Sequence, residues 1–385
     1  MKKVKFFIDD IPVEGSQDES IWTIAKKYGT ILPHLCYSDK PGYRADGNCR
    51  ACMVSIEGER VLAASCIRTP SEGMKVYTKD ERSSKSREMV IELLVTDQPK
   101  KEICHDPDSH FWHMADKVNV KKSRFDKRNP ETIPEADNSH VAMSVNLDAC
   151  INCNLCVRAC REVQVNDVIG MGNRGHTSQV IFDFNDPMGD STCVSCGECV
   201  QACPTGALME SNLLDEKGKK VVKPDRKVDS LCPYCGVGCQ LTYNIKGEKI
   251  VSVDGRDGPA NNNRLCVKGR FGFDYIHNPE RLTKPLIRKD GIPKDPKERV
   301  DPLNPLSHFR EATWDEALDL AANKLLKIRD SKNGKKALAG FGCAKGSNEE
   351  AYLFQKLVRT GFHNNNVDHC TRMCHASSVA ALMEA

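Results

Sequence analysis

The sequence has few aromatic residues and no long apolar run. Phe, Trp and Tyr together make up 6% of its 385 residues, and hydrophobic residues 39%, whereas charged residues reach 28%. No apolar run approaches the ~18 residues of a membrane-spanning helix, so we expect no membrane segment. This composition suits several small modules better than one large core, and the chain length predicts about two or three domains.

The chain also lacks a strong excess of charge of either sign. Its 56 Lys and Arg residues nearly balance its 53 Asp and Glu residues, which gives a formal net charge of +3. Nothing in this balance demands a nucleic-acid partner. The basic start MKKVKFFIDD becomes acidic at Asp9 and Asp10, too early for the apolar stretch of a secretory signal. We therefore expect a cytoplasmic protein.

Cysteine, by contrast, is abundant. The chain holds 20 cysteines, and most of them lie in tight clusters. A reducing compartment does not favour wholesale disulfide pairing, and thiols two residues apart are typical ligands of metals or iron–sulfur clusters. The cysteine clusters are therefore the most informative feature of the sequence.

Two similar cysteine quartets, CINCNLCVRAC and CVSCGECVQACP, form an internal repeat. Two-residue gaps let three thiolates converge from one tight loop on a cubane cluster, and in two-cluster ferredoxins the fourth cysteine ligates the other cluster. The first 4Fe–4S ligand set is therefore expected to be Cys150, Cys153, Cys156 and Cys203. The second is expected to be Cys193, Cys196, Cys199 and Cys160. A pair of zinc sites is the alternative, but zinc ribbons place two CxxC pairs apart.

Four further cysteines lie in the first domain: Cys36, Cys49, Cys52 and Cys66. Their spacing is not the plant-type ferredoxin pattern. It resembles the 2Fe–2S ferredoxin-like domain at the start of the large subunit of respiratory complex I and of related hydrogenases and formate dehydrogenases. The resemblance implies a β-grasp fold. VKFFIDD and IPVEG predict a hairpin, and SIWTIAKKYG predicts a short helix with Asp18 or Ser20 near its start, which agrees with that fold. A zinc site is the alternative.

A third constellation combines CPYCGVGC with LCVKGRFG. Its cysteines are Cys232, Cys235, Cys239 and Cys266. Gly236 and Gly238 allow a tight backbone turn around a cluster. The spacing and the CVKG close resemble the 4Fe–4S domain that opens molybdopterin oxidoreductases. In that family the lysine after the last ligand lies between cluster and pterin, which implies this role for Lys268; a surface lysine is the alternative.

One cluster of such relatives is expected to be absent. Its ligand pattern is His-x3-Cys-x2-Cys-x5-Cys, and with Cys104 as the third ligand the other positions hold Asp97, Lys101 and His110. Because three ligands are replaced or changed, we expect no cluster here. A variant site remains open with His105, His110 or His113.

The stretch GMGNRG, Gly170–Gly175, matches a dinucleotide-binding fingerprint. That motif must follow a strand and open a helix, but the following HTSQVIFDF is strand-like. We therefore expect a glycine-rich hairpin turn and no nucleotide-binding loop for NAD or flavin.

NNNVDHCTRMCHASSVAAL, residues 364–382, resembles the active-site segment of molybdenum- or tungsten-dependent formate dehydrogenases. There a cysteine or selenocysteine followed by histidine binds the metal, which implies Cys374 as metal ligand and His375 as its partner. Cys374 precedes a run of helix formers, and a helix N-terminus favours a thiolate. Histidine can carry the proton left when formate becomes CO2. The alternatives are two buried thiols, Cys370 and Cys374, or a zinc clip with His369.

Five domains are expected in a multidomain α+β chain: 1–80, a 2Fe–2S β-grasp domain; 81–140, a helical and irregular connector with the degenerate cluster region; 141–212, a bacterial-type 2x4Fe–4S ferredoxin domain; 226–282, a small β 4Fe–4S domain of molybdopterin oxidoreductases; and 283–385, the beginning of their catalytic α/β domain. Further predicted elements are helices at 83–95, 314–330 and 348–361, a strand at 335–342, and a hairpin over 240–255 with its turn at Lys246–Gly247. The last domain has too few strands to close an α/β core, so we expect a fragment.

The resemblance implies the N-terminal portion of the catalytic subunit of a formate dehydrogenase or CO2 reductase. It implies one 2Fe–2S cluster, three 4Fe–4S clusters and a Mo or W bis-molybdopterin guanine dinucleotide. Electrons would leave past Lys268 through the clusters to a partner subunit of the NAD/flavin, ferredoxin or hydrogenase type, in a hetero-oligomer. Alone, the chain is expected to be incomplete for turnover. The alternatives are an electron-transfer subunit like the complex I large subunit, without molybdenum cofactor, or another molybdopterin oxidoreductase such as a nitrate reductase relative.

Overall fold

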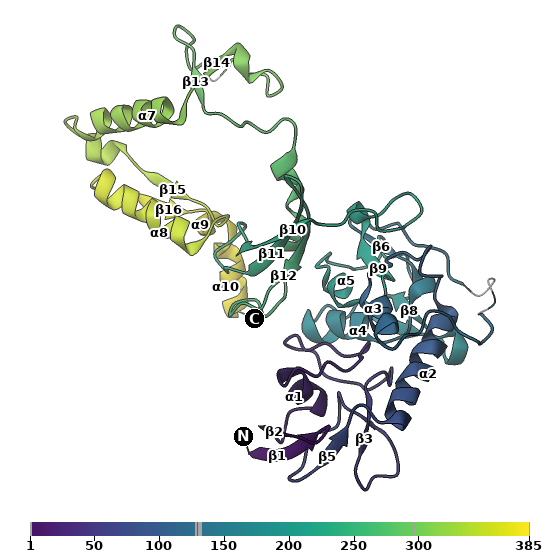
Figure 1. Cartoon of the computed structure of the whole chain (residues 1–385). Coiled ribbons are helices and arrows are strands. Elements are labelled where there is room, and N and C mark those ends of the chain that lie inside the picture. Colours follow the sequence, from purple (N-terminus) through teal and green to yellow (C-terminus); the bar gives the residue numbers. More distant parts are fainter. Residues whose placement is uncertain (1, 128, 130–132, 296, 385) are drawn as a thin grey trace. The chain divides into compact units, whose positions relative to one another are not determined.

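A computed structural model describes residues 2–127, 129, 133–295 and 297–384 (Figure 1). The chain divides into two compact units. The first unit comprises Met1–Ser230 and Gln240–Phe271, and the second comprises Leu231–Cys239 and Gly272–Ala385. Met1 and Ala385, the outer bounds of the first and last predicted domains, lie outside the described residues.

The first unit begins with a five-stranded mixed sheet in the order β2-β1-β5-β3-β4 (Figure 1). Its strands are β1 Lys3–Ile8, β2 Ile11–Ser16, β3 Met53–Ile56, β4 Ala63–Ala64 and β5 Lys75–Tyr77. β1 pairs antiparallel with β2, as the predicted hairpin requires, and parallel with β5. Alternate residues of β1, Val4, Phe6 and Ile8, are buried, so one face of the sheet faces a core.

Helix α1 (Ile21–Lys27) packs on that buried face. Of the two predicted caps, Ser20 is the one that begins the helix, because its Oγ accepts a hydrogen bond from the Thr23 amide at 3.2 Å. Ile21 and Trp22 join the strand residues in one core. Each fully buried side chain of this size stabilises the fold by about 1.5–3 kcal/mol.

The helix predicted at 83–95 is longer in the structure: α2 spans Glu81–Asp97. Asp80 caps it by accepting the Ser83 amide at 3.1 Å, which extends the helix into polar residues that periodicity could not assign. Helix α3 (His110–Lys117) follows, and its buried Phe111 packs in the core of the connector.

Two β-ribbons frame the paired cysteine quartets. They are β6 Met143–Val145 with β9 Leu208–Glu210, and β7 Ile169–Gly172 with β8 Gln179–Phe182. The helices are α4 Leu155–Arg158, continued by a π-helical turn at Ala159–Val163, and α5 Glu198–Ala202. The GMGNRG stretch therefore belongs to a β-hairpin, as predicted, and it opens no helix comparable to that of a dinucleotide fold.

A three-stranded sheet and one short helix complete the first unit, except that Leu231, the last residue of β10, belongs to the second unit. They are β10 Arg226–Leu231, β11 Gln240–Lys246, β12 Lys249–Gly255 and α6 Val267–Phe271. The predicted hairpin is present, but its two turn residues are Gly247 and Glu248, one position later than predicted. Gly247 has φ +58°, which glycine adopts without strain.

The second unit contains two small ribbons and four helices among its described residues. The strands are β13 Leu286–Arg288, β14 Phe309–Glu311, β15 Gly340–Gly342 and β16 Val367–His369, and the helices are α7 Trp314–Arg329, α8 Asn348–Lys356, α9 Thr371–Cys374 and α10 Ala376–Glu384. β15 and β16 run parallel. The strand predicted at 335–342 is shortened to β15 because Gly334–Ala337 forms a 3-10 turn. The helix predicted at 348–361 ends its α-helical part at Lys356 and finishes as a π-helical turn.

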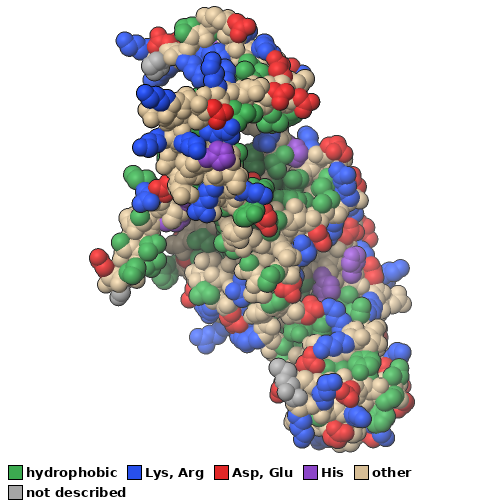
Figure 2. Space-filling view, turned by 90° about the vertical axis from the view of Figure 1, so that its left-hand side faces the viewer, with side chains coloured by type: hydrophobic (Ala, Val, Ile, Leu, Met, Phe, Trp, Pro, Cys, Tyr) green, Lys and Arg blue, Asp and Glu red, His purple; other side chains and the backbone are tan. Residues whose placement is uncertain are grey.

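The surface carries mixed charge. Figure 2 shows Lys and Arg side chains interspersed with Asp and Glu over the face drawn, in keeping with the net charge of +3. Within the described part of the chain, no helix combines the length and the apolar character needed to cross a membrane.

Candidate iron–sulfur sites and metal-binding cysteine

The four cysteines of the first domain form one group of hydrogen-bonded thiols. Hydrogen bonds from Cys49 and Cys66 lower the pKa of Cys36, and a hydrogen bond from Cys66 lowers the pKa of Cys52. Cys36, Cys52 and Cys66 are buried, whereas Cys49 is half-buried. Hydrogen bonds to Cys36 and Cys52 and burial raise the pKa of Cys66, and a hydrogen bond to Cys36 and burial raise that of Cys49. The Cys49 amide also donates to Cys36 Sγ at 3.4 Å, so the group favours the thiolate form at Cys36 and Cys52 and the thiol form at the other two cysteines.

The two cysteine quartets repeat the same backbone turn. Asn152 and Asn154 have φ of 51° and 62°, and the equivalent Ser195 and Gly197 have φ of 57° and 68°. In each loop the residue two after the first cysteine donates its amide to that sulfur, at 3.4 Å for both Cys150 and Cys193. The repeated left-handed residues fold each loop back over its own sulfurs before α4 or α5 begins.

The first expected ligand set lines one small cavity. Its cysteines are Cys150, Cys153, Cys156 and Cys203. Apolar Val180 and Leu208 are among the other residues that line it. Burial raises the pKa of Cys153 and Cys156, and the negative charges of the neighbouring cysteines, Cys203 included, raise it further.

The second expected ligand set is brought together in the same crossed fashion. Burial raises the pKa of Cys199, and the charges of Cys196, Cys193 and Cys160 raise it further. Cys160 receives the Val168 amide at its sulfur at 3.3 Å. Each group thus combines three cysteines of one run with the fourth cysteine of the other.

The donor sets fit iron–sulfur clusters. Several thiols held together in an apolar site resist ionisation, and a bound metal offsets their mutual repulsion because it deprotonates its thiol ligands. Among the described residues, no three His, Cys, Asp or Glu side chains could hold a single metal ion. A cubane spreads its four thiolates farther apart than one ion does, so that finding concerns single-ion sites. The ligand roles themselves stay predictions.

A buried ion pair supports the second quartet. Arg270 and Glu198 are each 1% exposed, with Nη2 and Oε2 3.4 Å apart, and Tyr43 Oη donates to the other Glu198 oxygen at 2.8 Å. Arg270 Nε also donates to the carbonyl of Cys196 at 3.3 Å. A Cβ at Gly197 would lie 2.8 Å from Arg270 Cγ, so the close approach needs glycine there.

The third cysteine group is divided between the two units. Cys232, Cys235 and Cys239 belong to the second unit, where the Cys232 amide donates to the Cys239 carbonyl at 2.9 Å. Exposed Cys266 belongs to the first unit, as does Lys268, which is exposed on α6. Their roles as fourth ligand and intervening lysine therefore stay predictions.

The residues of the degenerate cluster region have other partners. His105 Nε2 lies 2.8 Å from Asp148 Oδ1, and its Nδ1 lies 2.8 Å from the Gly218 carbonyl. His110 Nε2 lies 2.7 Å from the His34 carbonyl. Cys104 is buried and donates to the Lys101 carbonyl at 3.2 Å. The imidazoles of His105 and His110 thus form hydrogen bonds to residues far away in the sequence.

Cys374 closes the short helix α9 and is exposed, as is His375. Its amide donates to the Cys370 carbonyl at 2.9 Å. The run of helix formers forms α10 from Ala376 on, as predicted. Cys374 itself, however, is the last residue of α9 and so lies at a helix C-terminus as well as just before a helix N-terminus. The alternative of two buried thiols does not hold, because Cys374 is exposed and Cys370 is only half-buried.

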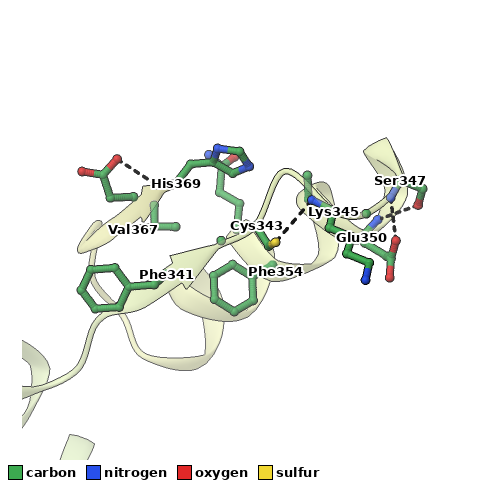
Figure 3. Close-up of a pocket in the computed structure, with 13 residues that line it drawn as sticks. Phe341, Cys343, Lys345, Ser347, Glu350, Phe354, Val367 and His369 are labelled. Atoms are coloured by element: carbon green, nitrogen blue, oxygen red, sulfur yellow. Dashed lines mark hydrogen bonds between the residues drawn. The ribbon is translucent and has the colours of Figure 1, made fainter. Parts of the chain in front are cut away.

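A cavity of about 520 Å³ lies at the carboxyl ends of β15 and β16, beside the start of α8 (Figure 3). Ser347 and Glu350 form a capping box there. Lys345 lines the cavity, and its Nζ lies 5.2 Å from the ring centre of Tyr234, between Cys232 and Cys235. The sequence patterns used above did not single out these residues. A strand followed by a glycine-containing turn and a capped helix is nevertheless a pattern typical of ligand-binding sites.

The chain matches four protein families in order. Residues 1–81 match a 2Fe-2S iron-sulfur cluster binding domain, and 149–207 match a 4Fe-4S dicluster domain. Residues 225–278 match the molybdopterin oxidoreductase Fe4S4 domain, and 281–385 match the molybdopterin oxidoreductase family itself. The predicted multidomain architecture is confirmed by these matches.

Two curated relatives show the same likeness over almost the whole chain. The "Probable oxidoreductase YjgC" of Bacillus subtilis (strain 168) is 30% identical over 97% of this chain and 40% of its own length. The "Putative formate dehydrogenase SH0748" of Staphylococcus haemolyticus (strain JCSC1435) is 30% identical over 94% of this chain and 38% of its own length. The chain thus spans about 40% of the length of these relatives.

Among solved structures, a chain of an NAD+-reducing NiFe-hydrogenase in the H2-reduced state is 25% identical, with a TM-score of 0.48, over 54% of this chain and 87% of that one. The four family matches, in their order along the chain, carry the assignment. The chain therefore carries, in this order, a 2Fe–2S domain, a 4Fe–4S dicluster domain, a molybdopterin oxidoreductase Fe4S4 domain and a region that matches the molybdopterin oxidoreductase family.

Proposed function

We propose that this chain is part of the catalytic subunit of a formate dehydrogenase or CO2 reductase that depends on molybdenum or tungsten. The observation that carries the proposal is the exposed Cys374–His375 pair at the end of α9. An electron-transfer subunit without molybdenum cofactor would have no use for an accessible thiol and imidazole at this position. The name of the Staphylococcus haemolyticus relative supports formate as the substrate.

The iron–sulfur clusters and the Mo or W bis-molybdopterin guanine dinucleotide, when bound, would supply one-electron transfer and hydride acceptance. Within the chain, Cys374 would offer a soft thiolate to the metal. His375 would hold and release the proton that formate loses, since an imidazole changes charge near neutral pH. Sixteen cysteines would hold one 2Fe–2S and three 4Fe–4S clusters, in the sets given above.

The cavity beside α8 suits the anionic part of the pterin cofactor. Backbone amides of a helix start favour phosphate groups, and α8 begins at the cavity wall. Lys345 adds a cation to the same wall, which the carboxylates of Glu350 and Asp368 also line. The volume of about 520 Å³ lies within the usual range of small-molecule sites.

Electrons would leave through the clusters to an accepting subunit of the NAD/flavin, ferredoxin or hydrogenase type. The accepting subunit and the hetero-oligomer are proposed from the sequence resemblance. The chain would need the rest of the subunit for turnover, in keeping with its share of the length of the curated relatives.

Replacing Cys374 by alanine in the full-length enzyme should lower viologen-coupled formate oxidation by at least about 100-fold, since changes even to groups that only support a metal ligand cost 10–100-fold. Molybdenum or tungsten content should fall with it. The matched control is Cys370→Ser, four positions earlier, for which we expect less than about a tenfold loss. Retained formate oxidation in the Cys374→Ala variant would exclude the catalytic role. Turnover of nitrate but not formate by the wild-type enzyme would indicate a different molybdopterin oxidoreductase.

A further inference from the structure

Arg158 is a buried arginine that belongs to none of the cluster ligand sets. It is the last residue of α4, two positions after Cys156, and its side chain is 2% exposed. A guanidinium stays charged in proteins, and removing it from water costs several kcal/mol unless hydrogen bonds and a counter-charge compensate. The groups that Arg158 contacts must therefore supply this compensation.

The guanidinium of Arg158 joins two cluster loops. Its Nη2 donates to the carbonyl of Cys36 at 2.7 Å and to the carbonyl of Cys153 at 3.1 Å. Cys36 is an expected ligand of the 2Fe–2S cluster, and Cys153 is an expected ligand of the first 4Fe–4S cluster. One nitrogen thus holds the backbone of two cluster ligands from different domains.

The other two guanidinium nitrogens also bind the loop that carries Cys36, so that Arg158 forms a junction between this loop and the loop of Cys153. Nε lies 3.1 Å from Asp46 Oδ2, and Nη1 donates to the carbonyl of Arg44. Both partners lie in the loop that carries Cys36 and Cys49. The planar fork of arginine can reach all these acceptors together, whereas the single ammonium of lysine cannot.

Apolar packing places the junction away from water. Cys36, Tyr43, Cys153, Leu155, Ala159 and Val163 form one buried cluster. In such surroundings solvent screens the guanidinium charge little. Asp46 offsets part of that charge at Nε, whereas Nη2 faces the carbonyls of the two expected cluster ligands. Reduction potentials of iron–sulfur clusters depend on net charge and on hydrogen bonds around the sulfurs.

We propose that Arg158 is a positioning residue that clamps the 2Fe–2S loop to the first 4Fe–4S loop and raises the reduction potentials of both clusters. The inference rests on the proposed cluster binding. One side chain would thus fix the distance between the two clusters and shift both of their reduction potentials in the same direction. The guanidinium contacts given above include no cysteine of the second 4Fe–4S ligand set (Cys193, Cys196, Cys199 and Cys160), so that cluster serves as an internal reference.

The test is a redox titration of the full-length protein, followed by electron paramagnetic resonance, for the wild type, Arg158→Gln and Arg158→Lys. In Arg158→Gln we expect lower potentials for the 2Fe–2S cluster and one 4Fe–4S cluster, and electron transfer between them slowed about tenfold or more, by analogy with other supporting residues of metal sites. Arg158→Lys keeps the charge and should retain most of the potentials, but not the rate. The cluster of Cys193, Cys196 and Cys199 should keep its potential in both variants.

Arg161→Gln is the matched control, because Arg161 lies three positions later, is 55% exposed and pairs with exposed Asp167. It should leave all potentials unchanged. Wild-type potentials and rates in both Arg158 variants would overturn the inference and leave the proposed function intact. A wild-type protein without a 2Fe–2S or 4Fe–4S signal would overturn both. If Arg158→Gln fails to fold, Arg158→Lys decides: a slowed rate supports the clamp, and a wild-type rate refutes it.

Discussion

Replacing Arg270 by methionine is expected to destabilise the first unit by about 3–5 kcal/mol, the range for removing one partner of a buried ion pair. The substitution leaves the carboxylate of Glu198 buried with its counter-charge gone. Burial already raises the pKa of Glu198, against the effect of Arg270. The hydrogen bonds from Arg270 to Gln201 Oε1, at 2.7 Å, and to the Val253 carbonyl, at 2.9 Å, are lost as well.

The measurement is thermal unfolding of the cluster-loaded protein, together with amide hydrogen exchange over β12 and α5, because several domains need not unfold in one step. Arg68→Met is the matched control: Arg68 pairs with Glu59 at the surface, at 44% and 32% exposure, and such pairs contribute about 0–1 kcal/mol. A double variant, Arg270→Met with Glu198→Leu, should recover part of the loss. Equal effects of Arg270→Met and Arg68→Met would contradict the account.

Replacing Cys203 by alanine is expected to remove about four irons per chain, because Cys203 would close the first 4Fe–4S cluster rather than the second. The cavity that Cys203 shares with Cys150, Cys153 and Cys156 is the structural reason. The iron content of the anaerobically purified protein measures the loss. Cys104→Ala is the matched control, since Cys104 is buried but belongs to no expected ligand set, and it should retain all the iron.

Double variants test the crossed ligand sets. In a Cys150→Ala background, Cys203→Ala should cause no further loss, whereas in a Cys193→Ala background it should remove about four more irons. The opposite pattern would mean that each run of four cysteines holds its own cluster. In that case the pairing of each run with a cysteine of the other would be wrong.

Local patterns explain which elements could be predicted. The hairpin β1–β2 follows from alternation, and α1 follows from the cap at Ser20 and its apolar face. The two ferredoxin ligand sets were predicted from spacing, because three thiols of each set converge from one tight loop. The other two sets were predicted from the resemblance to known families, and all four stay predictions. The turn at Gly247–Glu248 was missed by one residue, since a single sequence fixes the register of a hairpin only weakly.

Long-range partners explain what could not be predicted. Arg158 and Arg270 are polar residues in a sequence rich in charge, and nothing nearby marks them as buried. The main acceptors of Arg158 are backbone carbonyls of a distant loop, which carry no side-chain signal. Lys345 lies beside Tyr234 in the folded chain, but the two residues are far apart in the sequence, so no local pattern indicated this contact. Buried arginines are uncommon, so a local pattern favours the surface for each of them.

The measurement that tests the central claim most directly is elemental analysis of the full-length protein, purified without oxygen. We expect about 14 irons per chain, two from one 2Fe–2S cluster and four from each of three 4Fe–4S clusters, together with one molybdenum or tungsten. Iron at this level without molybdenum or tungsten would leave an electron-transfer subunit and contradict the catalytic role. Zinc in place of iron at the cysteine sets would contradict the account as a whole.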